Sequence, residues 1–566
     1  MNPFVDEIVE KTAAAAALDK STVRELLSVP PREEMGDYAL PCFTLAKQLR
    51  KNPAAIAAEL AEKIATGEQI DRVEAAGPYV NFSLNRPRFI GYVLQQLVEK
   101  GENYGSLNQG EGKTLTIDFS SPNLAKPFTI AHLRSTAIGH AIYRIHAFLG
   151  WRCVGINHPG DWGANFGQLL AAYRRWADVK KVKANPVPEL VALYTRFNEE
   201  LEENPALQDE ARECLRQLEA GDGETRALWA FFVEEGRKEA QRIYDILEVH
   251  FDLTMGESEF ANKLEEVVEP FAEKGLAVAS EGALIVDLDE WDMAPCMLRT
   301  SRGTTTYHSR DLAALFYRYD TYRFDKMLYV TDVSQSLHFR QLFKAVELLG
   351  VEWSGCCAHA PFGLMTFKGE KISTRRGNMV FLEDVLDQAV ELTGAIIEEK
   401  NPDLEDKESI ARQVGISAVI FADLDSRRTR DVVFEWDEVL NFDGETGPYI
   451  QYTHARFCSI LRRYGKSVDL GVDLGGLGED AEMRVARQLA RFPACLEQAC
   501  SENEPSLVAT FLIELATVAN KFYNELPVLN GADQGVIKAR VVLVESVRIV
   551  LRTGLSLLGM KAPEEM

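Results

Sequence analysis

Residues 113–135 read KTLTIDFSSPNLAKPFTIAHLRS and predict a strand, a loop and the start of a helix in succession. The strand is expected at 114–119, which has β-like composition, and the helix at 130–149. A second strand at 153–157, a glycine-rich turn at 160–163 and another helix follow. Such alternation is typical of a parallel sheet with crossover helices, so we expect an α/β domain.

This α/β pattern extends over residues 113–435. A strand at 326–331 and a helix at 337–349 continue it, and a long charged helical stretch lies between its halves. We interpret that stretch as a helical insertion at about 175–290. The length of 566 residues allows roughly three or four domains of about 150 residues each.

Different patterns flank the α/β region on both sides. Residues 1–112 mix helical and strand-like segments, such as a predicted helix at 54–64 and a predicted strand at 79–84. We expect an N-terminal α+β domain there. After residue 435 nearly every segment is helical, which predicts an all-α bundle at 436–566.

The composition restricts where the chain works and what it binds. Nine cysteines without a Cys-x-x-Cys spacing argue for a reducing compartment. No apolar run approaches the ~18 residues of a membrane span, and the N-terminus has no signal-peptide pattern, so we expect a cytoplasmic protein without membrane contact. The net charge of −24 disfavours nonspecific DNA or RNA binding but leaves specific RNA recognition through local basic faces open.

The first candidate site is the loop and helix start at 120–135. It follows a strand at the carboxyl edge of the expected sheet, where ligands bind in open α/β folds, and a helix N-terminus favours phosphate. Pro122 and Pro127 keep the approach extended, while the small Ala131 lets the backbone come close to a ligand. An ordinary strand-to-helix connection explains a single histidine here equally well.

The second candidate site is the segment 367–378, FKGEKISTRRGN. Two adjacent hydroxyls stand between cations, and glycines bound the segment, which suits a mobile loop that clamps a polyphosphate. Taken alone, this pattern is better interpreted as a solvated basic turn.

Together, the two segments resemble the signature motifs of class I aminoacyl-tRNA synthetases, and their surroundings narrow the resemblance to arginyl-tRNA synthetases. TIAH at 129–132 stands at the place of the family's His-Ile-Gly-His motif, and KISTR at 371–375 at that of Lys-Met-Ser-Lys-Ser. Further matches are GDY at 36–38, NHPGDWG at 157–163, DVVF at 431–434 and GETGPYIQY at 444–452. Either nucleotide motif alone is weak, but the ordered set is highly specific.

The resemblance implies a Rossmann-like catalytic domain and a ligase that charges tRNA-Arg. In that reaction the arginine carboxylate attacks the α-phosphate of ATP, pyrophosphate leaves, and the terminal ribose of the tRNA takes the arginyl group. The protein's task is to position the reactants and neutralise charge on phosphate oxygens. The implied catalytic residues are Lys126, His132, Lys371 and Ser373, and the implied ATP-binding residues are Thr129, His132, Gly160 and Lys371.

Two departures from the family pattern bear on these roles. Thr129 replaces the first histidine of the motif, and its hydroxyl donates one hydrogen bond but cannot become cationic. Thr374 replaces the second lysine of the loop. In arginyl enzymes that lack this lysine, a lysine just before the first motif supplies the charge, and Lys126 stands at that place.

The resemblance also implies a pocket for the guanidinium group of arginine, whose five donors need anions and acceptors. Tyr307 and Asp311 match the family residues that hold this group, and their i, i+4 spacing puts both on one face of a predicted helix at 306–319. The other implied arginine-binding residues are Asp118, Ser121, Asn123 and Gln335. An ordinary ion pair with a neighbouring arginine, Arg310 or Arg318, is the alternative interpretation of Asp311.

Two tRNA-contacting regions are implied as well. The N-terminal domain resembles the family's module for the outer corner of tRNA, and the C-terminal bundle resembles its anticodon-binding domain. Candidate cations are Arg456, Arg463 and Arg487, although a solvated helix face explains each single arginine better. The resemblance further implies a monomer whose arginine activation requires tRNA.

ATP is the implied nucleotide, and Mg²⁺ is expected to arrive with it, bound mainly by phosphates and water. Histidines and cysteines show no ligand spacing, so we expect no protein-bound structural metal, and a cysteinyl enzyme is disfavoured. Thr129 and Ala131 leave a noncatalytic tRNA-binding paralogue open, against which Lys126, His132 and Lys371 argue. A nucleotidyltransferase of similar fold is a third hypothesis, which gives the helical C-terminal domain no purpose.

Overall fold

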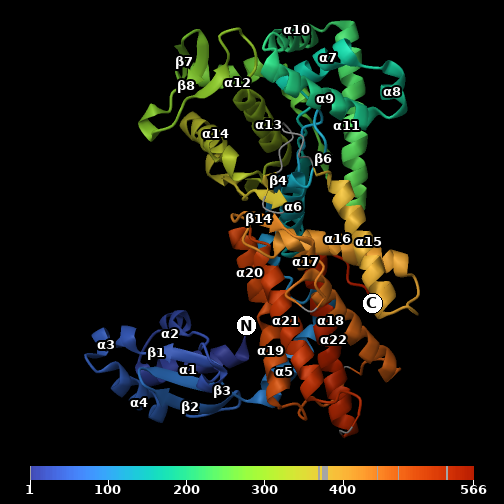
Figure 1. The fold of residues 1–566 in the computed structure, drawn as a ribbon. Helices are drawn as coiled ribbons and strands as arrows, with labels where there is room; N and C mark the ends of the chain where they lie inside the picture. Colours follow the sequence, from blue (N-terminus) through green and yellow to red (C-terminus); the bar gives the residue numbers. More distant parts are fainter. Residues whose placement is uncertain (1, 368–369, 372–379, 443, 470, 531–532) are drawn as a thin grey trace. The chain divides into compact units, whose positions relative to one another are not determined.

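The computed structural model describes residues 2–367, 370–371, 380–442, 444–469, 471–530 and 533–566 (Figure 1). Internal contacts divide the chain into two compact units. The larger comprises Gly105–Cys458, Phe492–Ala516 and Val550–Met566, and the smaller Met1–Tyr104, Ser459–Arg491 and Thr517–Ile549. Within the described residues we find no helix with the length and apolar character needed to cross a membrane.

A five-stranded parallel sheet organises the larger unit. Its strands lie in the order β11-β10-β4-β5-β6, and every neighbouring pair is parallel. The strands are β4 (Thr114–Asp118), β5 (Arg152–Asn157), β6 (Leu253–Thr254), β10 (Lys326–Tyr329) and β11 (Cys357–His359). β4 is buried along its whole length, as expected for a central strand covered on both faces. The expected Rossmann-like α/β fold is confirmed.

Helices connect the strands and cover the sheet. α6 (Ala131–Phe148) links β4 to β5, and α13 (Tyr307–Tyr322) and α14 (Ser336–Leu349) precede and follow β10. In α6 all residues from Leu133 to Ile142 are buried. The reason is that α6 contacts the sheet and also packs against α16 (Lys407–Leu424) and α20 (Phe492–Glu502).

The range 175–290, which the sequence predicts as one helical insertion, contains a return to the main sheet. Its first part is helical, and these helices are α8 (Val179–Ala184), α9 (Pro186–Glu203), α10 (Leu207–Glu219) and α11 (Gly223–Leu247), preceded by α7 (Ala164–Trp176). The chain then joins the sheet as β6, which pairs with β5. Next come α12 (Leu264–Glu273) and an antiparallel sheet of β7 (Ala277–Ser280), β8 (Ala283–Val286) and β9 (Cys296–Arg299).

A small sheet follows in the order β13-β12-β14. β12 (Met365–Phe367) pairs antiparallel with β13 (Glu370–Lys371) and parallel with β14 (Val432–Phe434). The remaining helices of this region are α15 (Leu382–Lys400) and α17 (Trp436–Val439). The C-terminal part is helical as expected, with α18 (Gly447–Tyr464), α19 (Asp480–Ala490), α20, α21 (Ser506–Glu525) and α22 (Gln534–Leu557). Residues of α18, α21 and α22 are divided between the two units.

The smaller unit contains a three-stranded antiparallel sheet in the order β1-β3-β2. Its strands are β1 (Tyr38–Pro41), β2 (Ile70–Ala76) and β3 (Tyr79–Leu84), and its N-terminal helices are α1 (Pro3–Ala16), α2 (Lys20–Leu26), α3 (Phe43–Leu49), α4 (Pro53–Lys63) and α5 (Arg86–Lys100). β3 buries Val80, Phe82 and Leu84, which is the period-two pattern of a strand with one face on a core. An N-terminal α+β fold is therefore confirmed.

Candidate active site

The chain turns sharply where β4 ends. Ser120 and Ser121 both have positive φ, 67° and 45°, which non-glycine residues rarely adopt. The Ser120 amide donates to Ser135 Oγ at 2.9 Å, and its hydroxyl lies 2.9 Å from the hydroxyl of Tyr244 in α11. These buried contacts hold a strained turn that leads into α6, and strain of this kind is concentrated at functional sites.

His132 lies in the first turn of α6 and is held in one tautomer by Thr129. The Thr129 amide donates to Nδ1 of His132 at 3.0 Å, and the Thr129 hydroxyl lies 3.1 Å from the same nitrogen. Burial, with a smaller contribution from the charge of Lys126, lowers the pKa of His132 to about 4. The Thr129 carbonyl also lies 3.3 Å from Nδ1. The amide can only donate, which requires an unprotonated Nδ1, so the neutral ring carries its proton on Nε2 and presents it as a donor.

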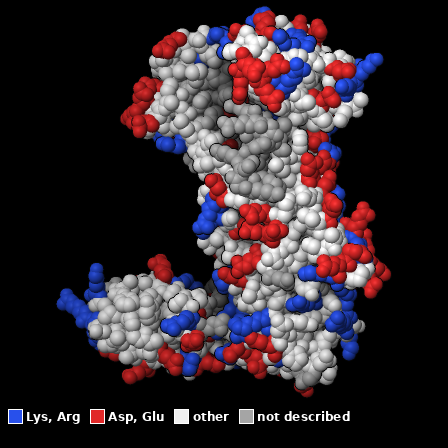
Figure 2. Space-filling model, viewed as in Figure 1, with Lys and Arg blue, Asp and Glu red and all other residues white. Residues whose placement is uncertain are grey.

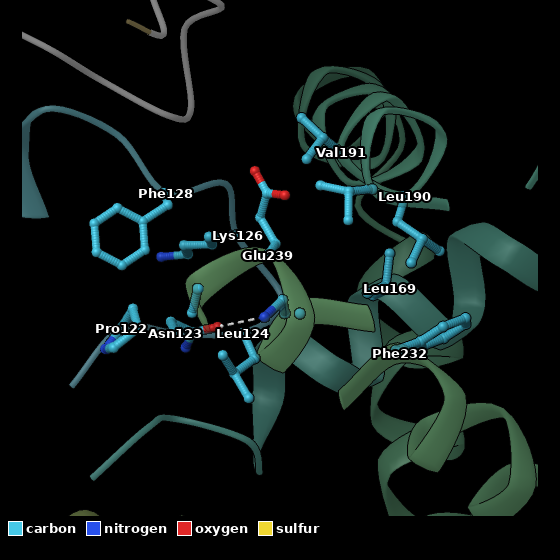
Figure 3. A pocket seen from close by; sticks show the side chains of 14 residues that line it. Pro122, Asn123, Leu124, Lys126, Phe128, Leu169, Leu190, Val191, Phe232 and Glu239 are labelled. Atoms are coloured by element: carbon cyan, nitrogen blue, oxygen red, sulfur yellow. Dashed lines mark hydrogen bonds between the residues drawn. The ribbon is translucent and has the colours of Figure 1, made fainter. Parts of the chain in front are cut away.

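A narrow cleft lies beside this turn, between the loop 122–128 and the helices α9 and α11 (Figure 3). Lys126 and Phe128 line it from the loop, and Leu190 of α9 and Glu239 of α11 line it from the insertion. Gly236 lets α11 approach the loop, because a Cβ there would stand 2.8 Å from the Leu124 carbonyl oxygen. The lining is mainly apolar, with Lys126 and Glu239 as its charged groups.

The glycine-rich turn at 160–163 joins the same loop. Gly160 donates to the Pro122 carbonyl at 3.0 Å and accepts from the Leu124 amide at 3.1 Å. A Cβ at Gly160 would lie 3.2 Å from Nδ2 of Asn123, so a glycine permits this close approach. The Asn123 side chain also accepts from the Ala125 amide at 3.1 Å, the bond that is dashed in Figure 3.

Asp118, at the end of β4, already has a cationic partner. Its Oδ2 lies 2.7 Å from Nη2 of Arg318 in α13, and both side chains are almost fully buried. The Ser121 hydroxyl donates to Oδ1 of Asp118 at 2.6 Å and accepts from the His158 amide at 2.8 Å. Asp118 and Ser121 therefore lie together, next to a buried arginine of the chain itself.

Asp311, one turn after Tyr307 in α13, meets histidines. Its Oδ2 lies 2.6 Å from Nε2 of His338, and its Oδ1 lies 3.9 Å from Nε2 of His158. Burial opposes ionisation, but the hydrogen bond and charge of His338 outweigh it and hold the pKa of Asp311 below its usual value. Of the two arginines expected as alternative partners, Arg310 pairs with Glu257 at 2.9 Å and Arg318 pairs with Asp118.

The other two residues expected in the arginine pocket are exposed. Tyr307 is 57% exposed, and the Arg310 guanidinium lies 4.9 Å from the centre of its ring. Gln335 ends the short 3₁₀ helix η6 (Val333–Gln335) just before α14 and is exposed. Both side chains are therefore more exposed than those of Asp118 and Asp311.

Three buried polar atoms at this edge of the sheet have no hydrogen-bond partner within the described part of the chain. They are Oδ1 of Asn157, Nε2 of His158 and the hydroxyl of Tyr329. Asn157 and Tyr329 are the last residues of β5 and β10, the two neighbours of β4. Buried polar groups are rarely left unpaired, so each of these atoms is a candidate contact for a polar ligand.

Several of these residues have no role in the sequence interpretation. His158 lies inside a quoted motif, NHPGDWG, which is the signal that points to it. Glu257 and His338 carry no local signal, because each acquires its importance from a partner in another segment of the chain. Arg318 is expected only as an alternative partner of Asp311, and it pairs with Asp118 instead.

The second candidate site, segment 367–378, is described only in part. Lys371 ends β13, where its backbone pairs with Thr366 of β12. Ser373 lies outside the described residues. Of the candidate tRNA contacts, Arg456 lies 4.9 Å from the ring centre of Tyr452, and Arg463 is exposed. Arg487 pairs with Asp37 at 2.6 Å within the smaller unit.

Comparisons with known proteins agree along the whole chain. Three families match: "Arginyl tRNA synthetase N terminal domain" at residues 4–84, "tRNA synthetases class I (R), catalytic domain" at 93–436 and "DALR anticodon binding domain" at 450–566. The arginine–tRNA ligase of Alkaliphilus metalliredigens is 46% identical over 542 residues, covering 96% of each chain. That of Clostridium botulinum strain Okra is 45% identical, covering 99% of each. The arginyl-tRNA synthetase structure from Thermus thermophilus superposes with a TM-score of 0.82 at 27% identity, covering 99% of each chain.

Proposed function

The chain belongs to the arginyl-tRNA synthetase family and is an arginine–tRNA ligase, and we propose that the carboxyl edge of its parallel sheet is the active site. It activates arginine with ATP and transfers the arginyl group to tRNA. The observation that carries the site assignment is that Asn157, His158 and Tyr329 each have a buried polar atom without a hydrogen-bond partner in the described part of the chain. They lie at the ends of strands next to β4, where ligands of open α/β folds bind.

In the first step, an arginine carboxylate oxygen attacks the α-phosphorus of ATP. The bond from phosphorus to the bridging oxygen breaks, and pyrophosphate leaves with that electron pair. Negative charge grows on the phosphate oxygens, and a fixed donor stabilises it without reorganising. We assign this role to the Nε2–H of His132, supported by the hydrogen bond from the Thr129 amide that keeps Nδ1 unprotonated.

Two lysines are proposed to neutralise the polyphosphate. Lys126 lies close enough to His132 for its charge to lower the histidine's pKa. Its position supports the expectation that Lys126 supplies the charge that Thr374 does not. Lys371, at the end of β13, is assigned to the pyrophosphate end, with Ser373 as a secondary donor and with Thr129 and Gly160 bordering the nucleotide.

Asp311 is the proposed partner of the substrate guanidinium. Of the three carboxylates considered for this role, Asp118 and Glu257 already pair with arginines of the protein. Asp311 is ionised and meets histidine nitrogens, so it is the carboxylate whose charge an incoming arginine side chain satisfies. Citrulline and lysine, which mispair with buried acceptors, should be strongly rejected.

Further roles follow from the resemblance. Asn123 and Ser121 are proposed to take the α-amino group, Tyr307 and Gln335 to complete the open end of the pocket, and Asp118 to line its floor. Arg456 and Arg463 remain the proposed contacts for tRNA-Arg, and Arg487, which pairs with Asp37, is a proposed contact only where tRNA displaces that carboxylate. We also propose that Mg²⁺ enters with ATP, and that the protein is a cytoplasmic monomer without DNA or membrane partners.

The test is arginine-dependent ATP–pyrophosphate exchange, measured with and without tRNA-Arg. We expect exchange with tRNA and none without it, because tRNA binding is proposed to complete the site. Exchange in both conditions would keep the chemistry and refute this coupling. An enzyme that binds tRNA but exchanges in neither condition would favour the noncatalytic paralogue, with Thr129 as the responsible substitution.

A further inference from the structure

Arg134 lies two residues after His132 in α6, and its side chain is completely buried. Arginine is almost never fully buried unless its charge and its donors are satisfied. Nothing in the proposed chemistry uses this residue. Its contacts therefore need an explanation of their own.

The guanidinium of Arg134 binds three backbone carbonyls and one carboxylate. Nη1 donates to the carbonyls of Gly363 at 2.9 Å and Arg430 at 2.8 Å, and Nη2 donates to that of Arg428 at 3.3 Å. Nε lies 2.8 Å from Oδ1 of Asp423 in α16, which is also fully buried, and this contact is an ion pair without hydrogen-bond geometry. One side chain thus joins α6 to three other segments.

Those carbonyls lie where the small sheet begins. Gly363 stands just before β12, and Arg428 and Arg430 stand just before β14. The Gly363 amide donates to the Arg428 carbonyl at 2.8 Å, so the two segments are already tied to each other. β12 pairs in turn with β13, whose last residue is Lys371.

We propose that Arg134 is a positioning residue for adenylate formation, which sets the spacing between His132 in α6 and Lys371 in the small sheet. This inference rests on the roles proposed above for His132 and Lys371. Each of these groups acts at a different end of the triphosphate, so their separation matters for the transition state. A misplacement of about 1 Å costs about 100-fold in rate.

The packing around Arg134 leaves little freedom for another arrangement. A Cβ at Gly363 would stand 2.4 Å from the Arg430 carbonyl oxygen, so the strands meet here only because this residue is glycine. Burial raises the pKa of Asp423 to about 6 even with Arg134 beside it. A buried ion pair of this kind adds little stability compared with apolar residues of the same volume, which favours a positional role.

The test compares Arg134→Lys, Arg134→Gln and Asp423→Asn with the parent in arginine-dependent pyrophosphate exchange, with tRNA-Arg present. Arg134→Lys keeps the charge beside Asp423 but cannot span three carbonyls. We expect the kcat of Arg134→Lys to fall about 100-fold while the KM for arginine stays unchanged. The kcat is calculated per arginine-binding site, and equilibrium binding of arginine gives the number of sites. The kcat of Arg134→Gln should fall by at least the same factor. Asp423→Asn leaves the carbonyl contacts in place and should lose only a few-fold.

Arg144→Gln is the matched control, since Arg144 also lies in α6 but hydrogen-bonds to Ser556 instead of the small sheet. Parent-like kcat in both Arg134 variants, with only a lower melting temperature, would overturn the inference. An equal loss in Asp423→Asn and Arg134→Lys would do the same, because the ion pair would then carry the effect. If Arg134→Gln does not fold, the comparison of kcat between Arg134→Lys and Asp423→Asn still tests the inference. An inactive parent enzyme would contradict the proposed function itself. An active parent whose Arg134 variants keep their kcat would contradict only the role of Arg134.

Discussion

Asp118 and Asp311 are both proposed for the arginine pocket but have different partners. Asp118 shares a buried ion pair with Arg318, whereas Asp311 meets His338 and His158. A carboxylate that already holds a guanidinium contributes to folding, and one that holds histidines remains available to a substrate. The two positions should therefore respond differently when the charge is removed.

Asp311→Asn is expected to raise the KM for arginine about 100-fold, which corresponds to about 3 kcal/mol of lost charge-assisted binding. Its thermal stability should change little. Asp320→Asn is the matched control, since Asp320 lies in the same helix and pairs with Arg323 at the surface. An unchanged arginine KM in Asp311→Asn would remove Asp311 from the pocket.

Asp118→Asn is expected to act mainly on stability, because it leaves the Arg318 charge buried and unpaired. The free energy of unfolding, measured with urea, should fall by about 3–5 kcal/mol. Arginine affinity of the folded fraction should change much less than in Asp311→Asn. A large rise in KM at full stability would instead favour direct contact between Asp118 and the substrate, as the family resemblance implies.

His132 is expected to act as a neutral donor from Nε2. Truncation by His132→Ala should lower kcat for exchange by about 10²–10³, the size of one lost transition-state donor. Gln places its amide near the position of Nε2 and should recover part of that loss, whereas Asn mimics Nδ1 and should not. Because the pKa of His132 is about 4, this residue should add no step to the kcat profile between pH 6 and pH 8.

Helix α6 contains buried histidines whose rings stay neutral. Burial lowers the pKa of His146 to about 4, and the charge of Lys326 adds to this. In the unfolded chain this histidine takes up a proton below about pH 6.5, while the folded one stays neutral to about pH 4. The unfolded state is therefore favoured as the pH falls through this window.

His146→Asn should remove this contribution while keeping a donor for the Ile142 carbonyl, to which His146 is hydrogen-bonded. Between pH 7 and pH 5 the parent should lose about 2 kcal/mol of unfolding free energy relative to the variant. Urea unfolding at the two pH values measures the difference. Equal losses in both proteins would mean that His146 is already charged in the folded state.

The main elements are predictable from the sequence because their signals are local. The strands expected at 114–119, 153–157 and 326–331 correspond to β4, β5 and β10, and the helix at 130–149 to α6. β6 and β11 are not predictable in this way, since they have two and three residues and show no period. Their places in the sheet come from parallel pairing with distant strands.

The candidate site is predictable to the same extent. The motifs point to the turn before α6, and the match to individual family residues points to Tyr307 and Asp311 in α13. It does not reveal which carboxylate is already neutralised, because Arg318 and Asp118 are far apart in the chain. The histidines around Asp311 and the anchoring of α6 by Arg134 depend on the same kind of long-range contact.

For the whole molecule, the net charge of −24 does not describe the surface that RNA meets. Figure 2 shows Lys and Arg side chains interspersed with Asp and Glu over the visible face, without one continuous basic field. Affinity for tRNA therefore depends on individual cations and on whether a protein carboxylate already engages them.

Arg463 and Arg487 differ in whether a protein carboxylate engages them, and the salt dependence of tRNA binding can distinguish their roles. Arg463 is exposed near the end of α18, while Arg487 pairs with Asp37, which also accepts from the Leu84 amide of β3. Arg463→Gln should reduce the slope of log K against log salt for tRNA-Arg by about 0.7–0.9, the share of one phosphate contact. Arg487→Gln should lower the melting temperature and leave the slope unchanged, because the charge of Arg487 already pairs with Asp37 inside the protein. A reduced slope in Arg487→Gln at parent-like stability would show that tRNA displaces Asp37, and would restore Arg487 to the RNA-binding surface.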